Sequence, residues 1–309
     1  MPDAPLIRIG NQTACSAQTP WQPFEYALAN GFDAFEWFPD RKPSGEGWEE
    51  SDLTVERRRE IRAAARGMDL SVHAQGQANP LRPDAGLVLL QDIALANDLG
   101  ARLLNVHLYT EEGLEVYLNS ILLLVAPLVA ADIRLSIENT PLTAPGDFNE
   151  LFARLHRLPA FRAACVGMCL DLGHANLCPA TRNDYLRYLD QLGPHVPIIH
   201  VHLHENWGDY DSHLPLFTGP AGSNPAGVRG LIARLKKRQY RGAVILEQWP
   251  QPPSLLNEAR ERLLRLWEQG PGAAKPSEPR SPRRTQPSPA PSRSRGSATS
   301  RAGAISRRT

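Results

Sequence analysis

Short apolar runs alternate with longer amphipathic stretches through most of the chain. The apolar runs predict strands at 5–10, 32–38, 69–75, 101–109, 133–140, 165–176, 197–206 and 242–249, where 165–176 includes the exit loop of its strand. The stretches between them, several closed by glycine, predict helices at 20–30, 53–67, 84–99, 112–131, 147–157, 181–192, 225–238 and 254–269. Strands that alternate with helices pair in parallel through right-handed crossovers.

Eight strand–helix units within residues 1–270 predict an α/β fold with a single (β/α)8 TIM barrel. An open, doubly wound sheet is the alternative. It is disfavoured because the first strand leads into G-N-Q-T at 10–13, which is not the G-x-G-x-x-G sequence of a dinucleotide-binding turn.

The net charge of +1 conceals two parts of opposite sign. Residues 271–309 hold nine Lys or Arg, one acidic residue, seven Pro and eight Ser, for a net charge of +8; residues 1–270 hold 25 basic and 32 acidic residues, for −7. We therefore predict one folded domain, 1–270, and a disordered basic tail, 271–309. Such a tail can contact nucleic acid or anionic lipid, and a solvated tail with no partner explains its composition equally well.

The remaining bulk features predict a cytoplasmic protein that does not enter a membrane. Cys15, Cys165, Cys169 and Cys178 form no C-x-x-C pair, and the N-terminus lacks the charged-then-apolar order of a secretory signal. The longest apolar run, 121–131, is shorter than the roughly 20 residues that a bilayer crossing requires.

Histidines are concentrated in one predicted strand and its loop. Five of the nine histidines lie within 195–213, and His200, His202 and His204 alternate with apolar residues. Alternate residues of a strand share a face, so these three imidazoles are expected to point the same way. The D-S-H sequence at 211–213 can reach the same space, and imidazole with carboxylate at short spacing is typical of a transition-metal site.

Most of the predicted strands end in a side chain that can bind metal. The strand ends are Glu36, His73, His107, Glu138, Asp171, His202 and Glu247, and the loops add His174, Asp211 and His213. In a (β/α)8 barrel these ends meet at one rim. Singly, each residue has an ordinary explanation as a helix cap, a turn residue or a buried hydrogen-bonded histidine. Together they favour a metal centre, because several carboxylates buried without a cation would be very costly.

Seven short motifs resemble those of the xylose isomerase-like barrels, which include sugar phosphate isomerases and epimerases and the type IV apurinic endonucleases. The motifs are V-H-A (72–74), N-V-H-L (105–108), I-E-N-T (137–140), D-L-G-H (171–174), H-L-H-E-N (202–206), D-S-H-L-P-L (211–216) and I-L-E (245–247). The resemblance spans residues 1 to about 270 and leaves the tail outside.

The resemblance implies a role for each matching residue. The metal ligands shared across the family match Glu138, Asp171, His202 and Glu247. In the endonuclease branch, residues matching His73 and His107 bind an additional metal bridged through Glu138, and those matching His174, Asp211 and His213 bind a third. In the epimerase branch, the residue matching His174 contacts substrate instead. The resemblance therefore implies one to three divalent ions (Mn, Zn, Co or Mg). We expect substrate contacts from His174 and, because of their places at the rim, from His73, His107 and Trp207.

The first functional hypothesis is a metal-dependent isomerase or epimerase of a sugar or polyol. Glu138 and Glu247 are the expected acid–base pair, which moves a proton through an enediolate. Trp37, Trp207 and Trp249 follow strand ends and either line the sugar site or simply pack at the rim. A dehydratase or lyase on the same scaffold begins with the same proton removal.

The second hypothesis is hydrolysis of abasic DNA by clustered metals. Residues that match the ligands of all three metals in that branch are present. However, residues 1–270 carry a net charge of −7 and the rim loops 75–80, 205–211 and 247–253 contain no Lys or Arg, whereas a DNA-binding face needs basic residues. Nucleic acid is therefore not the expected partner of the barrel, although the basic tail leaves such contact open. A third hypothesis is a sensor that binds metal or ligand without catalysis.

Two features bear on the substrate. The L-P-L-F-T-G-P-A-G loop (214–222) is two residues longer than the family's usual run, which places the substrate geometry in doubt. Apart from Arg41, Lys42 and Arg82, the rim has no Lys or Arg placed for a substrate phosphate, so a non-phosphorylated small sugar is preferred. The sequence leaves open whether the protein is a monomer or a homo-oligomer.

Overall fold

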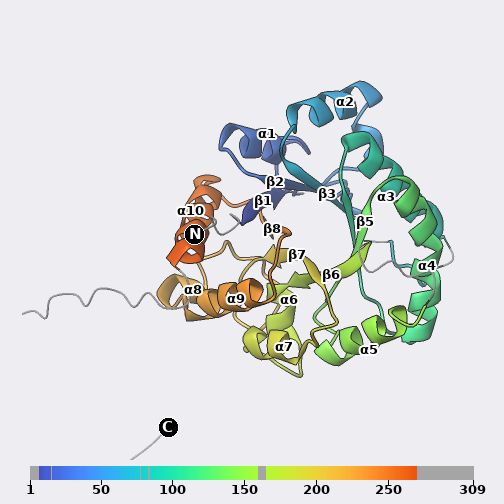
Figure 1. The fold of residues 1–309 in the computed structure, drawn as a ribbon. Helices are drawn as coiled ribbons and strands as arrows, with labels where there is room; N and C mark the ends of the chain where they lie inside the picture. The colour runs from blue at the N-terminus through green and yellow to red at the C-terminus, as the bar shows by residue number, and fades with distance from the viewer. Residues whose placement is uncertain (1–6, 15, 77, 83, 159–164, 270–309) are drawn as a thin grey trace, which may run out of the picture. The chain divides into compact units, whose positions relative to one another are not determined.

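Eight parallel strands close into a barrel in chain order, and β1 pairs with β8 (Figure 1). The computed structural model describes residues 7–14, 16–76, 78–82, 84–158 and 165–269. The strands are β1 Arg8–Gln12, β2 Ala34–Trp37, β3 Asp69–His73, β4 Leu103–His107, β5 Arg134–Glu138, β6 Val166–Asp171, β7 Ile198–Leu203 and β8 Ala243–Leu246. The predicted (β/α)8 TIM barrel is confirmed, and the predicted tail, 271–309, lies outside the described residues.

Helices surround the barrel and connect its strands, as Figure 1 shows. They are α1 Gln22–Ala29, α2 Val55–Ala64, α3 Ala85–Leu99, α4 Leu114–Ala130, α5 Pro145–Leu155, α6 Leu172–Leu177, α7 Tyr185–Gln191, α8 Pro220–Ser223, α9 Ala226–Lys237 and α10 Ser254–Gln269, with a short 3-10 helix at Glu50–Asp52. The bounds of α10 match the prediction for 254–269, and its buried face includes Leu256, Leu263 and Leu266.

Two predicted boundaries were wrong for local physical reasons. The first strand, predicted to end at residue 10, continues to Gln12, because Asn11 and Gln12 pair with β2 as buried polar members of the barrel wall; residues 5 and 6 of that prediction lie outside the described residues. The predicted exit loop of the sixth strand contains α6. Asp171 caps this helix, because its carboxylate accepts a hydrogen bond from the backbone N–H of His174.

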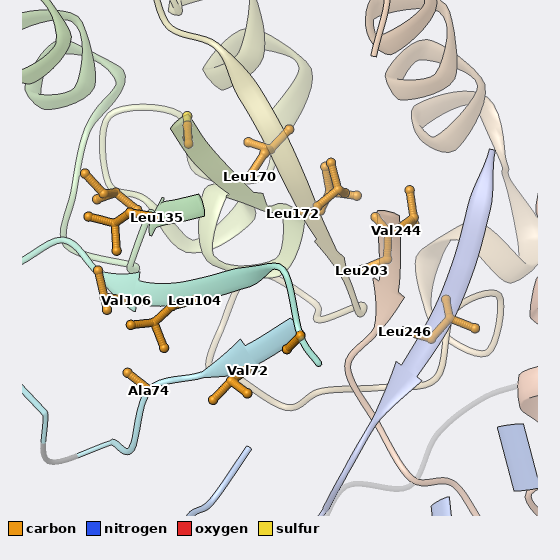
Figure 2. Packing of buried hydrophobic residues seen from close by; sticks show 14 of the residues in the cluster. Val72, Ala74, Leu104, Val106, Leu135, Leu170, Leu172, Leu203, Val244 and Leu246 are labelled. Atoms are coloured by element: carbon orange, nitrogen blue, oxygen red, sulfur yellow. The ribbon is translucent and has the colours of Figure 1, made fainter. Parts of the chain in front are cut away.

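The strands divide the molecule into an apolar outer layer and a largely polar interior. Alternate residues such as Val72, Leu104, Leu135, Leu203 and Leu246 belong to the main apolar core, and Figure 2 shows them packed together with their neighbours. The other residues of the same strands face the barrel axis. They include a small apolar group, Ala34, Ala243 and Ile245, and the buried polar residues Glu36, Ser71, His73, Asn105, Ser136, Glu138, Asp171, His200 and His202. Strand periodicity therefore carries polar side chains into the centre of the fold.

None of the helices in the described part of the chain combines the length and the apolar character needed to cross a membrane. The cytoplasmic location stays a prediction.

Candidate functional site

Four side chains from consecutive strand ends meet at the C-terminal mouth of the barrel. Glu138 and Asp171 are the last residues of β5 and β6, His202 lies near the end of β7, and Glu247 directly follows β8. One ligand atom from each of the four lies within 4.8 Å of the others, and all four residues are buried. The structure thus brings together the four residues that the family resemblance pairs with a metal.

Each of these residues has a buried polar atom with no hydrogen-bond partner among the described residues. The atoms are Glu138 Oε1, Asp171 Oδ2, His202 Nδ1 and Glu247 Oε2. His202 Nδ1 lies 3.4 Å from Glu247 Oε2 and 3.9 Å from Asp171 Oδ2. Buried polar atoms normally have partners, so several unpaired atoms around one point fit a site that could hold a cation. Three carboxylates and one imidazole are a donor set that suits Mn, Co, Zn or Mg.

Glu138 is the most contacted carboxylate of the site. Its Oε2 lies 3.2 Å from His73 Nε2 and 3.3 Å from His202 Nδ1, and its Oε1 lies 3.3 Å from His174 Nδ1 and 3.6 Å from His107 Nε2. His73, Glu138 and His202 form a further group whose ligand atoms fall within 4.8 Å of one another. His107 contacts Glu138 but is not part of that group.

A second cluster lies beside the first and is more open to solvent. Asp211 Oδ2 is 3.1 Å from His174 Nε2 and 3.2 Å from His213 Nε2, and Oδ1 is 3.7 Å from His204 Nε2. The rings of His204 and His213 stack at a centroid distance of 3.9 Å, and the ligand atoms of all four residues lie within 4.8 Å. His204 is the member that sequence reasoning did not assign, although its place on the histidine face of β7 was the available signal.

The charges of these groups balance through protons when no cation is present. Burial by itself would raise the pKa of Glu138, but the imidazoles of His202 and His107 outweigh it and hold that pKa well below its usual range. Burial would lower the pKa of His73, yet the Glu138 carboxylate raises it to about 9. In the same way, Asp211 outweighs burial and raises the pKa of His213 to about 9. A divalent cation would take the place of these protons.

Beneath the four-residue centre lies a buried acid that sequence reasoning placed at the rim. Glu36 points into the barrel, where its Oε2 accepts hydrogen bonds from Ser71 Oγ at 2.8 Å and from His200 Nε2 at 2.8 Å. Its Oε1 lies 2.8 Å from His202 Nε2, although the two are not aligned as a hydrogen bond. Burial alone would raise the pKa of Glu36, but His202 and His200 hold it well below the usual range. Glu36 therefore contacts the histidine of the centre from below.

The three tryptophans considered as lining for a sugar site lie in three different places. Trp249 lines a cavity of about 670 Å³ together with Glu247, His213, Phe38 and Lys42. Trp207 is exposed and lines a separate cavity of about 290 Å³ with His204. Trp37 belongs to the outer core, where it packs on Phe24, Phe35 and Trp48, so it cannot line a substrate site.

Comparisons with known proteins agree with this architecture. The family described as xylose isomerase-like TIM barrel matches residues 24–266. The uncharacterized protein y4fM of Sinorhizobium fredii is 26% identical over 226 residues, which is 61% of this chain and 70% of that protein. A D-tagatose 3-epimerase-like protein superposes with a TM-score of 0.65 at 19% identity, covering 85% of this chain and 99% of its own. The TTHB071 protein of Thermus thermophilus, from a crystal soaked with ZnCl2, gives 0.62 at 22% identity with the same coverage.

Proposed function

Because the chain belongs to the xylose isomerase-like TIM barrel family, we propose that it is a divalent-metal-dependent isomerase or epimerase of a sugar or related polyol. The observation that carries this proposal is the set of unpaired buried atoms of Glu138, Asp171, His202 and Glu247 around one point. The likeness to a D-tagatose 3-epimerase-like protein supports the class of substrate.

Glu138, Asp171, His202 and Glu247 are the residues that would hold the metal. When bound, a divalent ion polarises a carbonyl and so makes the neighbouring C–H more acidic. The protein supplies the rest of the chemistry, beginning with a buried mouth in which charge–charge interactions are strong.

Glu138 and Glu247 are the proposed proton-transfer pair. They come from β5 and from the end of β8, so they approach the centre from separate parts of the barrel wall. One carboxylate removes the proton beside the substrate carbonyl to give an enediolate, and the other returns a proton to the adjacent position or to the opposite face. His174, which contacts both Glu138 and Asp211, is the residue proposed to orient a substrate hydroxyl, which would replace Asp211 as the partner of its Nε2. A dehydratase or lyase would share the first of these steps.

The larger cavity is the proposed entrance for substrate. It places Phe38 and Trp249 beside Glu247, which gives apolar surface for the C–H face of a sugar and a carboxylate for its reacting end. Its charged lining residues are one cation, Lys42, and the acids Asp40 and Glu247, with His213 beside them. The two acids match Lys42 and the protonated His213 in number, so the cavity offers no surplus positive charge to a phosphate group, and a non-phosphorylated substrate is favoured.

Elemental analysis and isotope exchange test the proposal together. We expect the purified protein to bind divalent metal and to catalyse exchange of solvent deuterium into at least one member of a ketose panel. Glu138→Gln should abolish this exchange and weaken metal binding. Glu150→Gln, which alters an exposed acid on α5, is the matched control and should keep both. Full exchange activity in Glu138→Gln would refute the assigned role.

One observation favours a second function, metal-dependent hydrolysis of abasic DNA. The cluster of His174, His204, Asp211 and His213 lies next to the first centre, and His73 adds a further group through Glu138. Several adjacent metals are suited to phosphodiester hydrolysis because they can stabilise both the attacking and the leaving oxygen. About three metals per chain, with nicking of an abasic duplex and no exchange into ketoses, would favour the nuclease. About one metal with ketose exchange would favour the isomerase.

A further inference from the structure

The N-terminal mouth of the barrel, at the opposite end from the metal ligands, carries an unusual group of arginines. Arg8 and Arg134 are the first residues of β1 and β5, Arg102 immediately precedes β4, and Arg241 lies two residues before β8. All four line one cavity of about 330 Å³, whose wall is formed by the starts of six strands. The topology of the barrel therefore gathers four guanidinium groups from distant parts of the chain around its axis.

The charge of this cavity is opposite to that of the domain around it. Residues 1–270 have a net charge of −7, yet the cavity lining includes four arginines and one acid, Asp69. Arg8 pairs with Asp69, and Arg102 pairs with Asp132 outside the lining. Arg241 is exposed and makes no hydrogen bond or ion pair with any residue in the described ranges. At least one guanidinium group is thus available to a ligand.

The floor of the cavity is polar and well ordered by hydrogen bonds. Ser71 and His200 are almost completely buried and line it from β3 and β7. Both donate to Glu36, so their positions are fixed. Because these two donors are engaged with Glu36, they shape the base of the cavity, and the guanidinium groups at its edge are the groups that would bind a ligand. Planar guanidinium donors match the geometry of phosphate oxygens, so the cavity is suited to a small oxyanion.

We propose that this cavity binds a small multivalent oxyanion of the phosphate class, either as the free ion or on a small metabolite. The ligand lies between the arginines of β1, β4, β5 and β8 and stabilises the strand starts that they occupy. An extended polyanion is a poor match, because its recognition requires a basic stripe along a surface and these arginines line a single cavity.

Thermal denaturation of the full-length, metal-loaded protein tests this site. Inorganic phosphate, compared with sodium chloride at equal ionic strength, should raise the melting temperature by about 2 °C or more. Arg241→Ala should lose most of this shift, and Arg241→Lys, which keeps the charge but not the planar fork, should lose part of it. Arg187→Ala removes the same charge from an exposed position on α7 and should behave as the native protein does.

Glycerol phosphate in place of inorganic phosphate separates the two sources of the oxyanion. An equal shift indicates a site that accepts phosphomonoesters, and a shift with inorganic phosphate alone indicates the free ion; both outcomes support the site. An equal shift in Arg241→Ala and the native protein would place the anion elsewhere, for example at the metal centre, and would overturn the proposal. No shift in the native protein would overturn it as well.

Discussion

His200 Nε2 donates a 2.8 Å hydrogen bond to Glu36 Oε2, although the two residues are 164 positions apart in the chain. The other carboxylate oxygen of Glu36 lies 2.8 Å from Nε2 of His202, whose Nδ1 faces the carboxylates of the candidate metal centre. Glu36 therefore contacts the imidazole on the side away from the proposed metal. A carboxylate at this distance attracts the imidazole by its charge and increases the basicity of the nitrogen that faces the metal.

Glu36→Gln should weaken metal binding without removing any of the four proposed ligands. We expect a loss of about tenfold to a hundredfold in affinity, measured by competition with a chelating dye. Ser71→Ala removes one of the other hydrogen bonds of Glu36 and leaves the contact with His202, so it should have the smaller effect. Unchanged affinity in Glu36→Gln would show that His202 is oriented by other contacts.

Gly173→Ala should disturb the second cluster through packing alone. A Cβ atom at this position would lie 1.9 Å from Cε1 of His204, so the imidazole could not keep its place. We expect a loss of about 1–3 kcal/mol in unfolding free energy, with reduced occupancy of any metal held by His174, His204, Asp211 and His213. Gly146→Ala is the control, because a Cβ there meets nothing within 4 Å. Equal stability of the two variants would contradict the assigned role of Gly173.

The sequence predicted the barrel well because its strands and helices differ clearly in hydrophobic period. It could not predict α6, since L-G-H-A-N-L has little helical pattern and the helix depends on a cap from Asp171, which is itself a site residue. The shift of β1 has a similar origin: Asn11 and Gln12 resemble a loop until pairing with β2 buries them.

The barrel topology predicted that the strand ends meet at one mouth, but it did not predict how deep each side chain lies along the barrel axis. Glu36 and Glu138 both lie near the ends of short strands, yet Glu36 lies beneath the centre and Glu138 within it. That difference follows from the stagger of neighbouring strands, which a single sequence does not encode in any local pattern. Trp37 was misplaced because one step along a strand moves a side chain from the inside of the barrel to the outside.

Asp92 on α3 should make stability depend on pH. Burial raises its pKa to about 7, and weak hydrogen bonds from Gln75 offset this only in part. The unfolded state therefore loses its proton first, and the stability contributed by the neutral acid declines as the pH rises from about 4 to about 7. Asp92→Asn should gain about 2 kcal/mol relative to the native protein between pH 5 and pH 8, measured by denaturant titration. A constant difference across that range would contradict the raised pKa.

Metal binding should release protons, because the cation and the protons compete for the same nitrogen atoms. Although burial opposes it, Glu138 raises the pKa of His73 and Asp211 raises that of His213, both to about 9. Below this pH the metal-free imidazoles are protonated, so the apparent affinity should rise with pH and level off near pH 9. The heat of metal titration at pH 7 should depend on the ionisation enthalpy of the buffer, and His213→Asn should lower that dependence only if the second cluster is loaded.

The same protons stabilise the metal-free fold fully below the unfolded pKa of 6.5, and this stability is lost as the pH rises through about 9. The metal-free protein should therefore melt at a lower temperature at pH 9 than at pH 7, whereas the metal-loaded protein should show little change. In the titration, heats of metal binding that do not depend on the buffer would mean that the imidazoles are already neutral before the metal binds.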